Sequence, residues 1–213
     1  AFSRQEKVSA QLCHDLGVSG HWFEAQLVPA LLDRLPAGSL LFAGNSMPVR
    51  ELDSFSGQFE KPLQLVANRG ASGIDGHVSS LLGLASASAD GTTVAGLIGD
   101  LAFYHDMNGL LAAPDCNATL IIINNDGGGI FRYLPQAGLD AFERYWSTPT
   151  GLDFRHAADL YGLPFRRVGR ADEFQQALND SLSQQGVKII EAVINPQHSV
   201  ERHRAYWEAV CNH

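Results

Sequence analysis

The sequence predicts an α/β protein in which a parallel sheet of about six strands carries helices on both faces. Short apolar runs alternate along the chain with longer stretches of helical spacing, a pattern typical of parallel strands joined by crossover helices. The runs at 92–98 and 118–123 are apolar almost without a break. Continuous rather than alternating apolar residues indicate strands that are buried on both faces.

The expected elements follow one another in strand–turn–helix order. Strands are expected at 39–43, 63–67, 92–98, 118–123, 165–168 and 187–194. Helices are expected at 21–35, 78–89, 103–113, 172–185 and 199–211. The third of these helices is expected to stop at Pro114, and the fourth before Gly186. A further helix start is expected at 45–48, where Ser46 offers a capping hydroxyl and Pro48 follows early.

Length and composition indicate one sizeable domain with a real core. The chain has 213 residues, of which 45% are hydrophobic and 18% charged. A net charge of −8 disfavours binding to nucleic acid or to an anionic membrane surface. Three scattered cysteines favour a reducing compartment, and we expect a cytoplasmic protein with no membrane insertion and no leader sequence. We expect 1–20 to be the tail of a preceding element, 21–213 to be the domain, and the chain, which lacks an initial Met, to be a piece of a longer protein.

Polar and glycine residues follow the two most apolar strands. Gly99 and Asp100 come directly after the first, and residues 124–129, with sequence NNDGGG, come after the second. Taken alone, Asp100 serves equally well as a helix cap or a metal ligand, and the second segment is also a turn former. Together they place a carboxylate and an amide at one edge of the sheet. Both are hard oxygen donors of the type that Mg²⁺ or Ca²⁺ binds, and such an ion would hold a diphosphate.

This combination resembles the signature of thiamin-diphosphate enzymes, in which a Gly-Asp pair and a later Asn-Asn pair bracket a helix and a strand. The resemblance implies that Asp100, the Asn125 side chain and the Gly127 carbonyl bind Mg²⁺ or Mn²⁺, which holds the diphosphate of thiamin diphosphate. It also implies cofactor contacts by Gly99, Leu101 and Ala102. Leu101 stands where the general pattern has Gly.

Further stretches at 44–50, 68–76, 103–110 and 124–131 resemble one branch of these enzymes. The branch is the 2-succinyl-5-enolpyruvyl-6-hydroxy-3-cyclohexene-1-carboxylate synthases of menaquinone biosynthesis (the MenD family), and the similarity, over about 21–195, is to their C-terminal diphosphate-binding domain. It implies decarboxylation of 2-oxoglutarate and addition of the succinyl carbanion to isochorismate. Both substrates are dicarboxylates, which guanidinium groups bind in a bidentate way. The resemblance accordingly implies that Ser46, Arg50 and Arg69 contact substrate or intermediate.

The remaining candidates surround these motifs. Gly73 and Ile74 lie in a glycine-flanked turn, where Ile74 is either a core side chain or, as the resemblance implies, an aliphatic wedge under the cofactor. Ile130 and Phe131 follow the glycine run and are expected to line the pocket. His77 and His105 invite an acid–base role, but nothing in the motifs assigns one. His156, His198 and His203 are expected to be surface or packing residues.

The resemblance also implies a partner domain. Thiamin enzymes use a Glu that contacts the aminopyrimidine ring, and in this family it comes from an N-terminal pyrimidine-binding domain, usually across a homodimer interface. We find no such domain here, so we expect the chain alone to be inactive or nearly so. Two alternatives stay open: a diphosphate- and metal-binding module that pairs with a separate pyrimidine-binding subunit, and another thiamin carboligase such as an acetolactate-type enzyme. Leu101 and the two arginines argue against the latter.

Overall fold

Six parallel strands form one sheet in the computed structural model, which describes residues 11, 15, 22–57 and 59–212. The strand order is β2-β1-β3-β4-β6-β5, and every neighbouring pair is parallel. The strands are β1 Leu40–Ala43, β2 Gln64–Ala67, β3 Val94–Gly99, β4 Ala118–Asn124, β5 Phe165–Val168 and β6 Val187–Val193. The predicted fold class is confirmed. The predicted tail at 1–20 lies outside the described residues, apart from 11 and 15.

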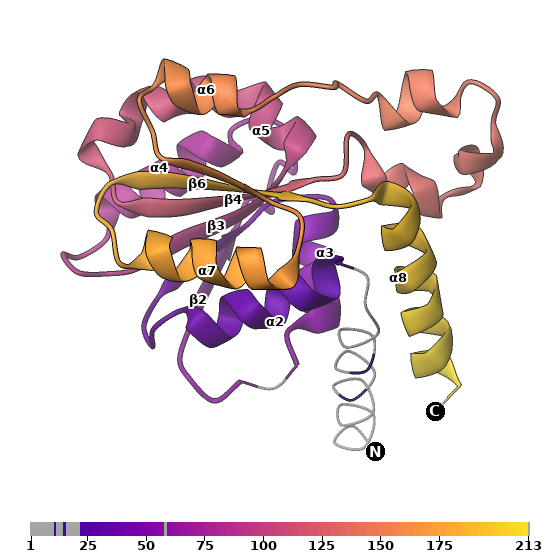
Figure 1. Cartoon of the computed structure of the whole chain (residues 1–213), viewed down its shortest axis with the longest axis horizontal. Coiled ribbons are helices and arrows are strands. Elements are labelled where there is room, and N and C mark those ends of the chain that lie inside the picture. The colour runs from indigo at the N-terminus through magenta and orange to yellow at the C-terminus, as the bar shows by residue number, and fades with distance from the viewer. Residues whose placement is uncertain (1–10, 12–14, 16–21, 58, 213) are drawn as a thin grey trace.

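Helices cover both faces of the sheet. In Figure 1, α2 and α7 lie on one face, while α4, α5 and α6 lie on the other. The helices are α2 Glu24–Arg34, α3 Met47–Phe55, α4 His77–Ala87, α5 Asp100–Asp106, α6 Arg155–Leu160, α7 Ala171–Leu182 and α8 Pro196–Cys211. Short 3₁₀ segments span Met107–Asp115, Gly129–Tyr133 and Pro135–Gly138, and a π-helical turn spans Glu143–Ser147. Within the described residues, no helix is both long and apolar enough to cross a lipid bilayer.

The packing of the central strand β4 explains why apolar and polar residues do not alternate in its sequence. Ile121 and Ile123 belong to the core under α2, α3 and α7, whereas Leu120 and Ile122 belong to the core under α4 and the 3₁₀ segment that follows α5. All four side chains are at most 2% exposed. Each contributes roughly 1.5–3 kcal/mol through its removal from water. A strand buried on both faces therefore favours apolar residues on both, which gives the nearly continuous apolar run.

The strand order reverses between β1 and β3. The chain passes from β1 through α3 to β2 on one side, and returns through α4 to β3 on the other side of β1. The connections after β1 and after β3 therefore diverge from neighbouring strand ends, which leaves a crevice at the carboxyl edge of the sheet.

The predicted helix at 103–113 is wrong in its bounds and its type. An α-helix begins directly after β3 at Asp100 and ends at Asp106, and the chain continues as a 3₁₀ helix that contains Pro114. The Asp106 carboxylate accepts hydrogen bonds from the Ser79 amide, at 2.7 Å, and from its hydroxyl, at 3.0 Å. Gly109 packs so closely on Ser79 that an added Cβ would lie 2.9 Å from the Ser79 nitrogen. This contact with the first turn of α4 fixes a tighter path than an α-helix would follow.

Three helix ends also differ from the prediction by three residues. The first is the start of α2, which lies at Glu24 rather than at 21. α8 begins at Pro196 rather than at 199, because the Asn195 side chain accepts hydrogen bonds from the amides of Gln197 and His198, both at 3.0 Å. α7 ends at Leu182, three residues short of the predicted 185. Gly186 follows in a left-handed conformation, with φ +87°.

Candidate functional site

A cavity of about 400 Å³ lies where the strand order reverses. Its walls come from the segments that follow β1, β2, β3 and β4. Every predicted site residue lines it: Ser46, Arg50, Arg69, Gly73, Ile74, Gly99, Asp100, Leu101, Ala102, Asn125, Gly127, Ile130 and Phe131. The structure therefore gathers at one place residues that the sequence distributes over more than 80 positions.

Asp100 joins the ends of β3 and β4. Its Oδ2 accepts a hydrogen bond from the Gly127 amide at 2.7 Å, and its Oδ1 accepts one from the Leu101 amide at 2.9 Å. Asp100 is the first residue of α5, and Gly99 rather than Asp100 occupies the N-cap position. The side chain is 3% exposed, and burial raises the pKa of Asp100 to about 7, against the lowering effect of the two amides. The carboxylate thus carries a desolvation penalty that a bound cation would relieve.

The glycine run after β4 holds a backbone path that side chains would block. Gly127 has φ +131°, and an added Cβ would lie 2.1 Å from the Ser147 carbonyl oxygen. An added Cβ on Gly129 would lie 2.4 Å from the Asn125 side-chain nitrogen. Asp126, also in the left-handed region with φ 55°, accepts hydrogen bonds from the amides of Thr150 and Gly151. These hydrogen bonds and close contacts fix the glycine run in place, and the Asn125 amide lies beside the cavity.

A chain of polar contacts connects the other two strand ends. The Asn45 amide nitrogen donates to the Gly73 carbonyl at 2.8 Å and lies 3.1 Å from His77 Nε2. A carbonyl oxygen only accepts hydrogen bonds, so the side-chain nitrogen of Asn45 is the donor to Gly73. The same nitrogen faces His77 Nε2, which is therefore an acceptor. The Arg69 guanidinium lies 3.5 Å from the side-chain oxygen of Asn45, to which it donates. Burial lowers the pKa of His77 from its ordinary value, which favours the neutral ring.

Ser46 occupies a strained position at the rim of the cavity. It has φ 70° and ψ −127°, which few non-glycine residues adopt. It sits at the N-cap of α3, but its hydroxyl makes no capping hydrogen bond. The Arg50 guanidinium donates to the Ser46 carbonyl at 2.7 Å. A purely capping role for Ser46 is therefore wrong, and the exposed residue lines the cavity.

Apolar residues form the remaining wall. Ile74 is 44% exposed and lines the cavity, so the alternative of a plain core side chain is wrong. Phe131 packs edge-to-face on Trp146, with ring centroids 5.4 Å apart. Ile130 lies beside it on the same 3₁₀ segment. These side chains make one side of the cavity apolar, whereas the side formed by Asp100 is polar.

Eight residues beyond the predicted ones also line the cavity. They are Asn45, Met47, Pro48, Ser72, His77, Ile123, Gly128 and Gly129. All but Ile123 lie inside the stretches that carried the resemblance or directly follow one, so adjacency to the motifs was the available signal. His77, to which the motifs assign no role, is buried against the cavity and orients Asn45. His105 is exposed and does not line the cavity.

Comparison with known proteins identifies the family that the chain resembles in sequence. Residues 52–192 match the family described as "Thiamine pyrophosphate enzyme, C-terminal TPP binding domain". The 2-succinyl-5-enolpyruvyl-6-hydroxy-3-cyclohexene-1-carboxylate synthase of Geobacillus kaustophilus is 47% identical over 192 residues, which are 89% of this chain and 33% of that protein. The enzyme of the same name from Listeria monocytogenes is 44% identical over 192 residues, again 89% and 33%. The chain thus spans about a third of the length of the curated relatives it matches.

Solved structures agree on the fold. The thiamine diphosphate-dependent 4-hydroxybenzoylformate decarboxylase of Rhodococcus jostii superposes with a TM-score of 0.66 at 26% identity, covering 84% of this chain and 33% of that one. Benzoylformate decarboxylase from Polynucleobacter necessarius superposes with a TM-score of 0.65 at 21% identity, covering 81% and 33%, and supports the fold alone. The family match covers most of the chain, and the cavity lies where its motifs converge. The chain therefore belongs to the family of C-terminal, thiamine pyrophosphate-binding domains of thiamine pyrophosphate enzymes.

Proposed function

We propose that this chain is the diphosphate-binding part of a thiamin-diphosphate-dependent 2-succinyl-5-enolpyruvyl-6-hydroxy-3-cyclohexene-1-carboxylate synthase, a transferase of menaquinone biosynthesis. The observation that carries the proposal is the hydrogen bond between Asp100 and the Gly127 amide, which brings the two halves of the thiamin signature to one point of the cavity. The identity of 47% with the Geobacillus kaustophilus enzyme supports this branch of the family.

The residues at this point fit a divalent cation. Asp100 offers a buried carboxylate whose raised pKa reflects the lack of water around it. Asn125 and Gly127 offer neutral amide and carbonyl oxygens beside the same cavity. Three oxygen donors with one negative charge suit Mg²⁺, which keeps its remaining positions for phosphate oxygens and water, and they also suit Mn²⁺. In the proposal these three residues hold the metal, and the metal holds the diphosphate.

The other cavity residues have separate roles in the proposal. Thiamin diphosphate, when bound, supplies the electron sink for decarboxylation and carbon–carbon bond formation. Arg50 and Arg69 bind carboxylate groups of 2-oxoglutarate and isochorismate, and the Ser46 hydroxyl donates a hydrogen bond beside them. Ile74 packs under the cofactor, while Ile130 and Phe131 exclude water from the reacting end. Gly73, Gly99, Leu101 and Ala102 shape the backbone against the cofactor.

The proposal includes a partner. Since the chain covers 33% of its relatives, the rest of such an enzyme would supply the pyrimidine-binding domain and its Glu, in a homodimer. A cavity open at one side, with Ile74 at 44% exposure, is consistent with a surface that another domain completes. The isolated chain is then expected to bind cofactor weakly and to give no turnover.

A domain exchange tests the activity. We expect a chimera in which this chain replaces the matching third of the Geobacillus kaustophilus enzyme to form product from 2-oxoglutarate and isochorismate. Decarboxylation of pyruvate by the same chimera is expected to be at least about tenfold slower, because pyruvate lacks the second carboxylate that an arginine would bind. Thiamin diphosphate binding by calorimetry checks that the chimera is assembled. A chimera that binds cofactor but prefers pyruvate would favour the acetolactate-type alternative.

The two arginines give a second test in the same chimera. Arg50→Gln and Arg69→Gln are each expected to raise the KM for one of the dicarboxylates by about ten- to hundredfold, since a lost charge-assisted hydrogen bond costs ~1.5–3 kcal/mol. Cofactor affinity should change little. Arg166→Gln is the matched control, because Arg166 is exposed on β5, at the far edge of the sheet, and pairs with Asp180. Unchanged KM values in both cavity variants would contradict the assigned roles.

A further inference from the structure

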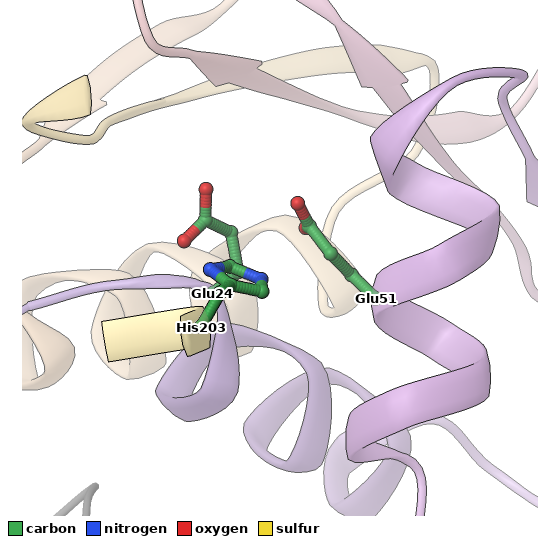
Figure 2. Close-up of side chains that lie close together, drawn as sticks. All are labelled: Glu24, Glu51 and His203. Atoms are coloured by element: carbon green, nitrogen blue, oxygen red, sulfur yellow. The ribbon is translucent and has the colours of Figure 1, made fainter. Parts of the chain in front are cut away.

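Two glutamates and a histidine meet in the interior, outside the cavity described above. Glu24 begins α2, Glu51 lies in α3 and His203 lies in α8. Each residue is only 1% exposed, and one potential ligand atom from each lies within 4.8 Å of the other two. Figure 2 shows the Glu51 carboxylate reaching across from α3 toward the other two side chains. Three separate helices thus converge on one small polar centre.

This centre contains unsatisfied polar atoms. Neither carboxylate oxygen of Glu51 has a hydrogen-bond partner among the described residues, and the same is true of Nε2 of His203. A buried carboxylate without a partner is costly, because water no longer solvates its charge. Burial raises the pKa of Glu51 well above its ordinary value, and repulsion from the neighbouring Glu24 carboxylate adds to the shift. The described protein atoms therefore offer the Glu51 carboxyl group no hydrogen-bond or charge partner.

The orientation of His203 suits a metal ligand. Its Nδ1 lies 2.8 Å from the Ser199 carbonyl, which can only accept, so the proton is on Nδ1 and the Nε2 lone pair is free in the neutral ring. Histidine ligands in metal sites use this arrangement, with the second nitrogen donating to a carbonyl or carboxylate. Aromatic rings hold the imidazole at centroid distances of 5.2–5.8 Å; they are Phe23, Phe55, Tyr133 and Trp207.

Glu24 is oriented in the same way. The Ser199 hydroxyl lies 2.9 Å from both of its carboxylate oxygens and donates to them. One residue of α8 therefore positions two of the three side chains, one through its hydroxyl and the other through its carbonyl. Such supporting contacts are typical of metal centres, where they fix ligand direction before the ion binds.

We propose that Glu24, Glu51 and His203 bind a structural divalent transition-metal ion, with Zn²⁺ as the expected species. Two carboxylates and a neutral imidazole carry two negative charges, which one divalent ion neutralises. The imidazole favours Zn²⁺ over Mg²⁺ and Ca²⁺, which prefer oxygen ligands. Zinc bonds of about 2.0–2.2 Å at tetrahedral angles place two ligand atoms about 3.3–3.6 Å apart. The present separations are at most 4.8 Å, so the flexible glutamate side chains need to close by up to about 1.5 Å.

The position of the cluster gives the ion a structural consequence. Glu51 follows Arg50 directly on α3, the helix that also brings Met47 to the cavity wall. A void of about 10 Å³ beside Glu24 is bounded by both Met47 and Asn125, two residues that also line the larger cavity. An ion at the cluster would therefore tie α3 to α2 and α8 directly behind the cavity. This inference stands on the cluster geometry and does not depend on the proposed synthase activity.

Metal content and ligand type test the proposal on the full chain. The chain is produced with added Zn²⁺, dialysed against a large excess of Mg²⁺, and its zinc counted by mass spectrometry. Wild type, Glu201→Gln and Asp100→Asn are expected to retain one zinc ion per chain, because Glu201 is exposed on α8 and Asp100 belongs to the other site. Glu51→Gln and His203→Asn are expected to retain at least about tenfold less.

X-ray absorption at the zinc edge of the wild type completes the test without any variant. The expected spectrum contains imidazole nitrogen together with carboxylate oxygen. Zinc-free wild type, equal zinc in Glu51→Gln, or a spectrum without imidazole would each overturn the metal site. In those cases the cluster is neutralised by a proton on Glu51, and Glu51→Gln should then be more stable than the wild type whether or not zinc is present.

Discussion

Replacing Asp100 by asparagine is expected to abolish Mg²⁺-dependent binding of thiamin diphosphate while making the metal-free chain more stable at pH 8. The two effects have one origin, because Asp100 is a buried carboxylate that no cation neutralises among the described residues. Asparagine keeps the shape and an oxygen that accepts from the Gly127 amide, but it gives up the bond from the Leu101 amide, because an NH₂ group only donates. It removes the charge that a divalent ion requires, and we expect the cofactor affinity measured with Mg²⁺ to fall by more than about 100-fold.

The stability effect depends on pH with a defined sign. The folded chain holds the Asp100 proton up to a pKa of about 7, whereas the unfolded chain releases it near pH 4. Between these values the folded state binds more protons, so the wild type loses stability as pH rises from about 4 to 7. The asparagine variant lacks this loss. Its advantage in the free energy of unfolding should therefore grow by roughly 2–3 kcal/mol between pH 5 and pH 8.

Calorimetry of the chimera described above, with and without Mg²⁺, measures the first effect, and urea unfolding of the chain in EDTA measures the second. Asp90→Asn is the matched control, since Asp90 is an exposed aspartate in the loop before β3 and should change neither quantity. Cofactor binding by Asp100→Asn that remains Mg²⁺-dependent and within about twofold of the wild type would contradict the metal role. A stability difference that stays constant with pH would contradict the buried-carboxylate argument.

The sheet and its functional edge were predictable from local sequence. β3 and β4 are short, uninterrupted apolar runs, and parallel strands bring their carboxyl ends to one edge. That rule places the Asp100 carboxylate and the Asn125 amide at one edge of the sheet, and both residues line the cavity. This part of the site could be predicted because each of its motifs is contiguous in sequence.

Other features depend on contacts between distant segments and leave no local signal. The 3₁₀ path after α5 is set by the bonds between Asp106 and Ser79, which a propensity argument for a helix at 103–113 does not contain. Ile74 lies in a turn whose sequence pattern fits a core position and a cavity position equally well. Only the folded structure shows that its side chain is exposed.

The cluster of Glu24, Glu51 and His203 shows the same limit most clearly. His203 was expected to be a surface or packing residue, and it is indeed packed among aromatic rings. Its two carboxylate neighbours come from helices far away in the chain, at no motif spacing. Helix packing alone brings them together, so the sequence offered nothing that would group them.

Replacing Gly127 by alanine is expected to lower the free energy of unfolding by about 3 kcal/mol or more and to remove cofactor binding. The new Cβ would lie 2.1 Å from the Ser147 carbonyl oxygen, and φ +131° is a conformation that alanine does not adopt without strain. That carbonyl also accepts a hydrogen bond from the Gly128 amide at 2.7 Å, so the two segments cannot separate without a further loss.

The displaced loop would also carry the Gly127 amide away from Asp100, leaving the buried carboxylate with one amide partner fewer. Gly138→Ala is the matched control, because no atom lies within 4 Å of its added Cβ and its φ is outside the left-handed region. Urea unfolding of the two variants, with calorimetry of thiamin diphosphate binding in Mg²⁺, separates strain at the site from a general effect of alanine. A Gly127→Ala chain within about 1 kcal/mol of the wild type that still binds cofactor would mean that the loop has room to relax, against the close approach that makes glycine necessary there.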